Sequence, residues 1–404
     1  MSIFSGKRII LGITGSIAAY KGADLASKLT QAGAQVETVF SSGAEKFVTP
    51  LTFQSVTGRK AFTDAELWGG EAHVLHVGLG HAADLLIIAP CTANTLAKLA
   101  HGQADNLLTV TALAAECPIL IAPAMDGGMY AHPATQENVR ILSERGVTFV
   151  GPAPGHLASG LVGVGRMSEP LEILGMARLT LGRKLGRLRG KRLVITAGGS
   201  QEPIDPVRVI SNRSSGRQGY ALAQAALEMG AAVTLISHPT ALSAPSGADV
   251  VRVETAQQML EAVSAAIKDA DGLVMAAAVA DFRVRTVAES KIKKRDGIPQ
   301  IQLEAAPDVL AAVARLREAA PRLKFVVGFA AESHDLLENA QSKLISKKLD
   351  MIVANDISAS DAGFGVETNR VCLLYGDGRQ EQLPLLSKYE VAEYILARVA
   401  ESLE

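Results

Sequence analysis

The chain has 404 residues, a formal net charge of −1, 48% hydrophobic side chains, 20% charged side chains and only 4% aromatic side chains. This charge excludes binding to nucleic acids or membrane surfaces by bulk electrostatics, and no apolar run approaches the roughly 20 residues of a membrane-spanning helix. Three scattered cysteines predict a reducing cytoplasm and no disulfide framework.

The first half of the chain alternates short apolar runs with helical patterns. Such an alternation predicts a parallel, doubly wound α/β sheet, whose ligands bind in the loops that follow the strands. The expected strands are 8–12, 35–40, 83–89 and 119–122, and the expected helices are 18–31, 95–101 and 135–145.

A stretch rich in arginine, lysine and glycine separates the two halves. It predicts a solvated linker at 183–191 between domains 1–182 and 192–404. The second half repeats the alternation, so we expect two Rossmann-like α/β domains. Two apolar runs around Gly376-Asp377-Gly378 add a predicted β-hairpin to the second domain. The expected strands of this half are 193–197, 232–237, 272–276, 325–328 and 351–354, and a helix is expected at 218–229.

Small-residue loops follow two of the first-half strands. The loop Gly15-Ser16-Ile17 opens a helix, and free backbone N–H groups at a helix start suit a phosphate. The loop Thr92-Ala93-Asn94-Thr95 offers small polar groups that can hydrogen-bond a planar ring system. These loops and the segment Pro123-Ala124-Met125 are expected to meet at one edge of the sheet.

Taken in order, a series of first-half segments resembles the homo-oligomeric flavin-containing cysteine decarboxylases over about residues 7–175. The segments are 15–21, 46–50, the region of His76, 92–95, 123–125 and 165–167. The resemblance implies a flavodoxin-like domain, an FMN site at a subunit interface and oxidative decarboxylation of a cysteine amide. The FMN-binding residues that it implies are Gly15, Ser16, Ile17, Ser41, Thr92, Ala93, Asn94, Thr95 and Met125.

The same resemblance identifies candidate catalytic residues. Asp126 stands where the family usually has an asparagine that holds the substrate carboxylate. An ionised Asp126 would repel that carboxylate, so it must be protonated, paired with Arg166 or turned away. Ser159 stands where the family commonly has a proton-donating cysteine in a flexible flap. A serine hydroxyl is a far weaker acid than a thiol, so His156 is the alternative donor, unless it is only a surface loop histidine.

His76 occupies the position of the family's base. A metal-binding interpretation is also open, because His73 and His76 are three residues apart and can share a helix face. No third ligand stands at a recognisable spacing, and a purely structural histidine is the other alternative.

Candidate nucleotide-binding segments occur in the second half. Residues 211–219 precede a helical pattern and offer hydroxyl groups, N–H groups and two arginines, Arg213 and Arg217, to a phosphate. An ordinary N-cap with a glycine turn is the alternative interpretation. A small-residue strand end leads to Asp281, which can accept hydrogen bonds from a base or ribose. Lys343 and Lys347, four residues apart, place two cations on one helix face, although such charges are usually just solvated.

Together with 196–199, 202–208 and 328–332, these segments resemble phosphopantothenate–cysteine ligase over about residues 190–400. The resemblance implies that CTP activates the 4′-phosphopantothenate carboxylate as an acyl-cytidylate, which the amine of L-cysteine then attacks. Asn212 would stabilise this intermediate and Lys291 would neutralise phosphate charge. Mg²⁺ is expected with the triphosphate, at ligands that the sequence does not identify. The implied nucleotide-binding residues are Ser214, Ser215, Gly216, Met275, Ala276, Ala277, Asp281, Lys291, Pro307, Asp308, Val309, Leu310, Phe329, Lys343 and Lys347.

The two implied reactions are consecutive, and the whole chain resembles the bifunctional bacterial enzymes of coenzyme A biosynthesis. We therefore expect small-molecule substrates, no nucleic acid and no membrane. The resemblance also implies trimers of the flavin domain and dimers of the ligase domain, which together can close as a homo-oligomeric dodecamer. Three alternatives stay open: a ligase whose flavin domain is a degenerate scaffold, a flavin-binding regulatory subunit without catalysis, and an NAD(P) dehydrogenase.

Overall fold

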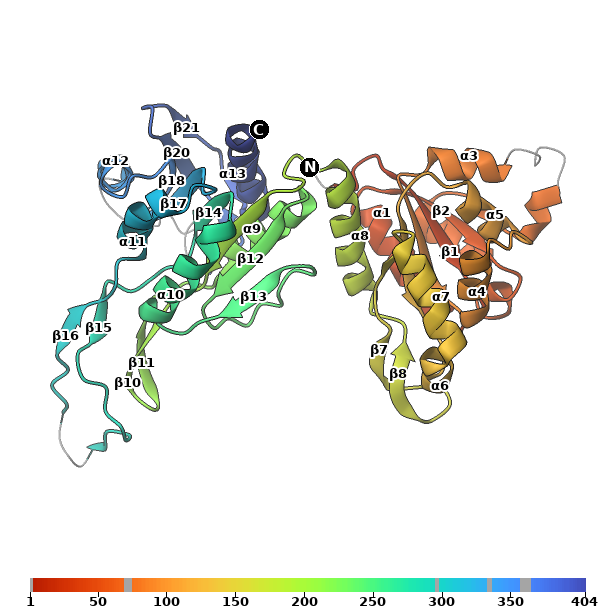
Figure 1. The fold of residues 1–404 in the computed structure, drawn as a ribbon, viewed down its shortest axis with the longest axis horizontal. Helices are drawn as coiled ribbons and strands as arrows, with labels where there is room; N and C mark the ends of the chain where they lie inside the picture. The colour runs from red at the N-terminus through yellow and green to blue at the C-terminus, as the bar shows by residue number, and fades with distance from the viewer. Residues whose placement is uncertain (1–2, 69–74, 295–297, 333–335, 357–364) are drawn as a thin grey trace. The chain divides into compact units, whose positions relative to one another are not determined.

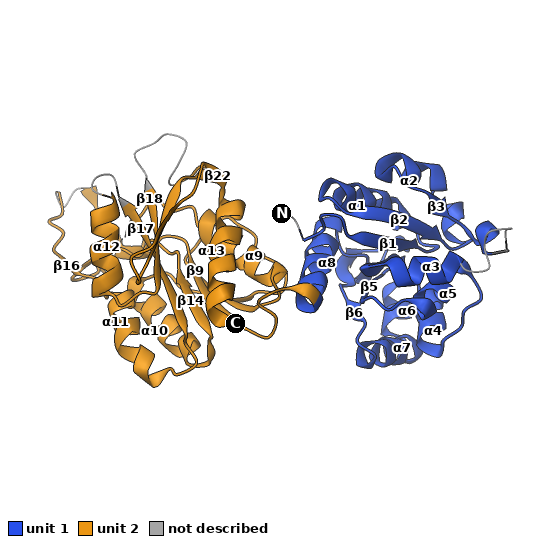
Figure 2. Ribbon diagram, turned by 90° about the horizontal axis from the view of Figure 1, so that it is seen from above, with its two compact units in different colours: residues 1–184 blue, residues 185–404 orange. Residues whose placement is uncertain are grey.

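The computed structural model describes residues 3–68, 75–294, 298–332, 336–356 and 365–404. The chain divides into two compact units, residues 1–184 and 185–404, and Figure 2 colours them separately. The division falls inside the last helix of the first unit. Within the stretch 183–191, Leu188 is fully buried and its N–H donates to the carbonyl of Met229 at 2.7 Å, so this stretch packs against the second unit.

The first unit is built around a parallel sheet with the strand order β3-β2-β1-β4-β5-β6, flanked by helices (Figure 1). The order runs outward in both directions from the neighbouring strands β1 and β4, so the topological switch point lies between them. Its strands are β1 Arg8–Ile13, β2 Gln35–Phe40, β3 Ala61–Phe62, β4 Leu85–Cys91, β5 Ile119–Pro123, β6 Thr148–Phe149 and the separate antiparallel hairpin β7 Ala153–His156 and β8 Val162–Arg166. Its helices are α1 Ala19–Gln31, α2 Pro50–Thr57, α3 Leu75–Ala82, α4 Ala93–His101, α5 Leu107–Ala114, α6 Gly127–Ala131, α7 Pro133–Glu144 and α8 Pro170–Leu185.

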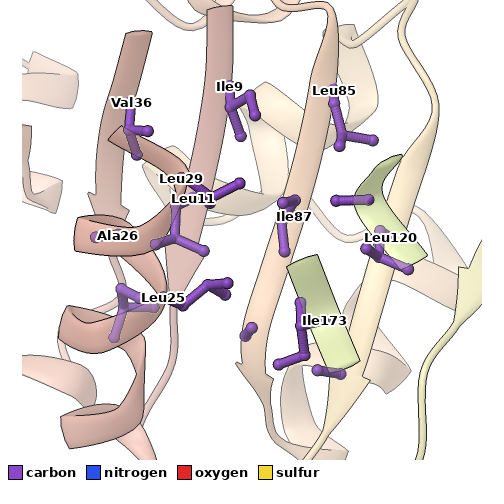
Figure 3. Close-up of a cluster of buried hydrophobic side chains, with 14 of the residues drawn as sticks. Ile9, Leu11, Leu25, Ala26, Leu29, Val36, Leu85, Ile87, Leu120 and Ile173 are labelled. Atoms are coloured by element: carbon purple, nitrogen blue, oxygen red, sulfur yellow. The ribbon is translucent and has the colours of Figure 1, made fainter. Parts of the chain in front are cut away.

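The central strands are apolar on both faces because helices cover both faces. Every residue of β4 is buried, as is typical of a parallel strand between helix layers. On one face, Leu25 of α1 and Ile173 of α8 pack against Leu11 and Ile87 of the sheet (Figure 3). Replacing one of these buried leucines by alanine typically costs about 2–5 kcal/mol, so this aliphatic layer fixes where the strand ends lie.

The second unit repeats this plan around the strand order β13-β12-β9-β14-β17-β18-β20-β21. Strands β13 to β18 run parallel, whereas β20 and β21 are antiparallel additions at one edge, and the switch point lies between β9 and β14. Its strands are β9 Arg192–Ala197, β10 Gln201–Asp205, β11 Arg208–Ser211, β12 Ala232–Ser237, β13 Asp249–Arg252, β14 Gly272–Met275, β15 Phe282–Val284, β16 Leu303–Ala305, β17 Phe325–Glu332, β18 Met351–Asp356, β19 Thr368–Asn369, β20 Val371–Tyr375, β21 Gln380–Gln382 and β22 Leu386–Ser387. Its helices are α9 Arg217–Glu228, α10 Ala256–Ala266, α11 Val309–Leu316, α12 Leu336–Ser346 and α13 Lys388–Leu403.

The predicted fold class is confirmed: both units are doubly wound α/β domains, and β20 and β21 form the predicted hairpin. Short hairpins such as β7–β8, β10–β11 and β15–β16 were not predicted, because glycine, proline and charged residues interrupt their apolar alternation. Within the described residues, no helix combines the length and the apolar composition needed to cross a membrane.

Candidate functional site

A cavity of about 950 Å³ opens at the carboxyl ends of β1, β2, β4 and β5, next to the switch point of the first unit. The loops after these strands form its walls because carboxyl ends of parallel strands meet at one sheet edge. The cavity lining includes all of the predicted FMN-binding residues: Gly15, Ser16, Ile17, Ser41, Thr92, Ala93, Asn94, Thr95 and Met125.

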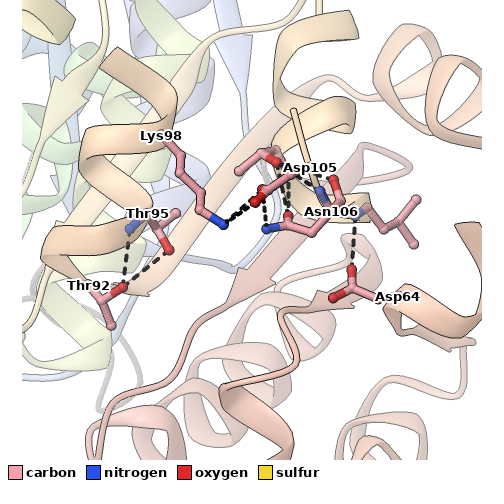
Figure 4. Close-up of polar contacts among 8 residues, drawn as sticks. Asp64, Thr92, Thr95, Lys98, Asp105 and Asn106 are labelled. Atoms are coloured by element: carbon pink, nitrogen blue, oxygen red, sulfur yellow. Dashed lines mark hydrogen bonds and ion pairs between the residues drawn. The ribbon is translucent and has the colours of Figure 1, made fainter. Parts of the chain in front are cut away.

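Thr14 joins two of these loops. Its Oγ1 donates a hydrogen bond to the Pro90 carbonyl at 2.8 Å and accepts one from the Thr92 N–H at 3.1 Å. Thr92 in turn caps helix α4, because its Oγ1 accepts the Thr95 N–H at 3.3 Å (Figure 4). A buried hydroxyl group at the end of β1 therefore sets the position of the polar loop that follows β4.

Lys98 and Asn106 extend the same wall of the cavity. The Lys98 ammonium donates to both carboxylate oxygens of Asp105, at 2.8 and 2.7 Å, and this contact holds the pKa of Asp105 below its usual range. Asn106 caps α5, and Asp64 accepts the Leu107 N–H at 2.9 Å (Figure 4). The cationic side chain on this wall is therefore already neutralised by a carboxylate.

The lining residues fit a flavin mononucleotide. A β-carbon on Gly15 would lie 3.0 Å from the Gly43 backbone, so any larger residue would push apart the loops after β1 and β2. The start of α1 offers backbone N–H groups and the Ser16 hydroxyl group, the combination that binds phosphate at helix N-termini. The hydroxyl groups of Ser41 and Thr92 and the amide of Asn94 add donors and acceptors for a polar ring edge.

Asp126 also lines the cavity, and its contacts favour the ionised carboxylate. Its Oδ1 accepts the Gly128 N–H at 2.9 Å, and its Oδ2 accepts the hydroxyl group of Ser159 at 2.7 Å. The Ser159 hydrogen bond, and then the Gly128 N–H, hold the pKa of Asp126 below its usual range. Of the three alternatives for Asp126, pairing with Arg166 is not among its contacts here, and Arg166 donates to Glu169 at 3.3 Å.

The predicted flap is the β7–β8 hairpin with its connecting loop, residues 153–166. His156 and Ser159 from this flap both line the cavity, so the structure brings His156, Ser159 and Asp126 together at one wall. His76 lies on α3 and is not among the residues that line the cavity in the described part of this chain. Its Nδ1 is buried and has no hydrogen-bond partner.

The described residues contain no cluster of three or more histidine, cysteine, aspartate or glutamate side chains that could hold a metal ion. His73, the other histidine of the metal-binding interpretation, lies outside the described residues. The third nearby histidine, His81, is placed 3.7 Å from the carboxylate of Glu116.

In the second unit, predicted residues gather at the switch point between β9 and β14. Thr196, at the end of β9, accepts the Ala277 N–H at 3.0 Å, and the Ala278 N–H donates to the Gly198 carbonyl at 2.8 Å. The side-chain amide of Asn212 donates to the Ala278 carbonyl at 3.1 Å. Met275, Ala276, Ala277 and Asn212 therefore lie near the carboxyl ends of β9 and β14, where doubly wound sheets form their ligand crevice.

Ser214, Ser215 and Gly216 form the turn into α9. Gly216 has φ of 77°, which favours glycine, and its N–H donates to the Ser214 hydroxyl group at 3.4 Å. Arg217 was expected to add charge for a phosphate, but its guanidinium group pairs with Glu367 at 2.5 Å and donates to the Gly365 carbonyl. The serine hydroxyl groups and helix N–H groups are therefore the main phosphate donors of this turn.

A third group lies where β17 and α12 meet the start of α11. Asp308 caps α11 by accepting the Ala311 N–H at 2.9 Å, and Lys347 forms an ion pair with its carboxylate. Partial burial opposes ionisation of Asp308, but the hydrogen bonds from Lys347 and Ala311 outweigh it and lower its pKa. The two predicted cations therefore differ in their contacts: Lys347 pairs with Asp308, whereas the Lys343 ammonium lies 3.5 Å from the Phe329 carbonyl. Pro307, Val309 and Leu310 flank Asp308 at this helix start.

Two further predicted residues lie on the surface of the second unit. Asp281 is exposed just before β15, and Lys291 is exposed in the segment between β15 and β16. Within the described residues, Asn212 and Lys291 make no hydrogen bond with each other. The structure thus positions Asn212 at the crevice and places Lys291 on a separate extension.

The sequence analysis did not predict the buried residues that hold the loops of the two sites in place. Thr14 and Thr196 are buried threonines at the ends of β1 and β9, and each accepts a loop N–H from the neighbouring central strand. Their signal was available, because both are polar residues that directly end an apolar run. Asp205 follows a local turn pattern, but its contact with Ile292 lies 87 residues away and has no local signal.

Comparison with known proteins matches both units to families. The flavoprotein family matches residues 4–179, and the C-terminal domain family of the DNA/pantothenate metabolism flavoproteins matches residues 188–403. The coenzyme A biosynthesis bifunctional protein CoaBC of Bacillus subtilis (strain 168) is 42% identical over 400 residues, which cover 98% of each chain. The protein of that name from Mycobacterium tuberculosis (strain H37Rv) is 45% identical over 96% of this chain and 95% of its own. A crystal structure of the C-terminal domain of a CoaBC is 40% identical, covers 54% of this chain and 98% of its own, and superimposes with a TM-score of 0.47.

Proposed function

The chain belongs to the family of bifunctional coenzyme A biosynthesis proteins, and from this premise we propose how its two units divide two consecutive reactions. The second unit ligates cysteine to 4′-phosphopantothenate, and the first unit decarboxylates the product to 4′-phosphopantetheine. The observation that supports the proposal is that predicted FMN-binding residues line a cavity at the switch point of the first unit, while Asn212 and Ala277 lie at the switch point of the second. Two such sites on one chain match two reactions.

In the ligase reaction, the phosphopantothenate carboxylate attacks the α-phosphorus of CTP and pyrophosphate leaves. The amine of cysteine then attacks the acyl carbon, and CMP leaves. Asn212, held by the Ala278 carbonyl, directs its amide toward the acyl-cytidylate, while the turn of Ser214 and Gly216 binds phosphate. A divalent ion such as Mg²⁺, bound with the triphosphate, would neutralise charge on the leaving pyrophosphate.

In the decarboxylase reaction, this chain's residues bind and orient the cysteine amide beside the flavin. FMN supplies the hydride chemistry at the cysteine side chain that makes loss of CO₂ possible. Ser159 and Asp126 hold the flap at the cavity wall through their hydrogen bond, and His156 beside them delivers the proton that completes the product.

His76 reaches the flavin from a neighbouring copy of the chain. Its position outside the cavity of its own chain supports this arrangement, as do exposed apolar side chains of the first unit, such as Tyr20 and Leu51. Exposed apolar residues on β11 and β15, such as Val209 and Phe282, support a second interface through the other unit. Together the two interfaces are consistent with the dodecamer.

The oligomer proposal is tested by complementation. A His76→Asn chain lacks the base, and a Ser16→Arg chain blocks its own cavity, so each alone should be inactive as a decarboxylase. Mixed oligomers should regain part of the activity, because an intact cavity then meets an intact His76. No recovery in verified mixed oligomers would place His76 at its own cavity.

We propose a cytoplasmic location for the enzyme. All three cysteines are buried and free, and burial raises the pKa of Cys91, so none of them points to an oxidising compartment. The placement also agrees with the small, charged substrates that the proposal assigns.

One incubation tests both reactions. Purified protein with 4′-phosphopantothenate, L-cysteine and CTP should release pyrophosphate and accumulate 4′-phosphopantetheine, followed by mass spectrometry. A second candidate function, a ligase with a scaffold flavin unit, is favoured by the ionised Asp126 and by Ser159 in place of the usual cysteine. That candidate predicts pyrophosphate release and an end product that keeps its carboxylate.

A further inference from the structure

The segment that carries Lys291 is tied to the β10–β11 hairpin. We call residues 285–294 the Lys291 arm; it leaves β15 and runs past the tip of β10–β11 (Figure 1). The Ala288 N–H donates to the Ile204 carbonyl at 3.0 Å. Next to Lys291, the Ile292 N–H donates to Oδ2 of Asp205 at 3.1 Å, and the Arg208 guanidinium group donates to the Ile292 carbonyl at 3.2 Å.

The two oxygens of Asp205 have different partners. Oδ1 accepts the N–H groups of Val207 and Arg208 at 2.8 and 2.9 Å, which organises the hairpin turn. Oδ2 accepts the Arg208 guanidinium group at 2.7 Å and the Ile292 N–H. The side chain of Asp205 has no exposed surface, and although burial opposes ionisation, the hydrogen bonds from Val207, Ile292 and Arg208 lower its pKa.

A turn alone does not require the contacts of Oδ2. An aspartate at a hairpin turn is sufficiently explained by its bonds to the N–H groups two and three residues ahead. Here Oδ2 accepts the Ile292 N–H, and the Arg208 guanidinium group, which Oδ2 orients, donates to the Ile292 carbonyl. Both polar groups of the Ile292 backbone are therefore held. The hairpin also leads directly into Asn212, so one rigid element joins the amide at the crevice to the arm.

We propose that Asp205 is a positioning residue for the ligase reaction: with Arg208 it holds the Ile292 peptide and thereby fixes where the Lys291 ammonium enters the active site. The proposal rests on the ligase function and on the charge-neutralising role of Lys291. Asp205 itself touches no substrate. Its effect is to reduce the conformations of the arm, so that Lys291 is already placed when phosphate charge develops.

Asp205→Asn separates the two functions of this side chain. Its remaining oxygen can still accept the turn N–H groups, whereas the amide nitrogen that replaces Oδ2 accepts no hydrogen bond from Ile292 or Arg208. Asp377→Asn is the matched control, because Asp377 accepts the N–H and the guanidinium group of Arg379 at the β20–β21 turn, away from the Lys291 arm. Ile292→Pro removes the donor from the arm and leaves Asp205 intact.

Three measurements on the full-length enzyme test the proposal: amide hydrogen exchange at residue 292, and kcat and KM for CTP-dependent pyrophosphate release. In Asp205→Asn, exchange at residue 292 should rise about tenfold, and kcat should fall about tenfold, while KM for CTP changes by less than about twofold. Lys291→Gln should lower kcat at least as much, and the double variant should be no slower than Lys291→Gln alone. Ile292→Pro should reproduce the loss of kcat, and Asp377→Asn should behave as the parent enzyme.

The failures are distinguishable. If Lys291→Gln has the same kcat as the parent enzyme, the assigned role of Lys291 is refuted. The positioning role of Asp205, which depends on it, is then refuted too. If Lys291→Gln is slow but Asp205→Asn exchanges fast at residue 292 with normal kcat, only the positioning proposal is overturned. If the fold losses in kcat of Asp205→Asn and Lys291→Gln multiply in the double variant, the positioning proposal is also overturned. If Asp205→Asn does not fold, Ile292→Pro decides the question by the same kcat criterion.

Discussion

Replacing Thr14 by valine should loosen the flavin cavity although Thr14 does not line it. Valine keeps the shape of threonine but removes the hydroxyl group that donates to the Pro90 carbonyl and accepts the Thr92 N–H. An unsatisfied buried polar group costs about 1–3 kcal/mol. Pro90 is buried, whereas Thr92 is partly exposed at the cavity, so most of the cost comes from the Pro90 carbonyl. We expect a loss of about 2 kcal/mol, or roughly 5 °C in the melting temperature of a unit of this size.

Thr38→Val is the matched control within the same sheet. Thr38 on β2 is as buried as Thr14, but its hydroxyl group has no hydrogen-bond partner. Removing this group should leave stability unchanged or raise it by up to about 1 kcal/mol. Thermal unfolding of the flavin-loaded enzyme, followed by the fluorescence of released FMN, measures both variants. Thr14→Val should also bind FMN about tenfold more weakly, and equal melting temperatures for the two variants would refute the reasoning.

Three further predictions concern charge and proton transfer. Asp126→Asn should keep or raise decarboxylation, because the amide oxygen still accepts the Ser159 hydroxyl group while the negative charge near the substrate carboxylate is gone; a hundredfold loss of turnover would show that the carboxylate itself is required. His156→Ala should stop the reaction at an ene-thiol that is two hydrogens lighter than the final product, and mass spectrometry that finds only the saturated amine thiol would exclude His156 as the donor. The pKa of Asp308 is lowered, so the stabilisation from its pair with Lys347 is complete above the unfolded value of about 3.9 and is lost as the pH falls through the lower folded value. Asp308→Asn should therefore flatten the dependence of unfolding free energy on pH below about 4, and a profile identical to that of the parent would contradict this.

The sequence predicts a site well where a strand leads directly into a loop. The loops at Gly15 and Thr92 were placed correctly because the apolar runs before them are continuous, and parallel strands bring their carboxyl ends together. The location of the cavity in the first unit follows from that rule alone.

Contacts between distant segments could not be predicted in this way. Ser159 meets Asp126 across 33 residues through a glycine-rich flap that lacks apolar alternation. Lys347 meets Asp308 across 39 residues, and Ile292 meets Asp205 across 87. Each of these pairings depends on where a hairpin or helix docks, and periodicity in the sequence records only which face of an element is apolar.

These distant pairings change how anionic substrates must bind. Several cations near the two sites already have a carboxylate partner: Lys98 has Asp105, and Lys347 has Asp308. A phosphate that approaches such a cation exchanges with an existing partner, so the net gain in charge pairing is small. At the starts of α1 and α9, the partners of the backbone N–H groups are neutral hydroxyl and carbonyl oxygens, not carboxylates, so these groups remain the main attraction for phosphate. Substrate affinity in both units should therefore depend less on ionic strength than the number of nearby lysines and arginines suggests, and a steep loss of FMN or CTP binding with salt would contradict this view.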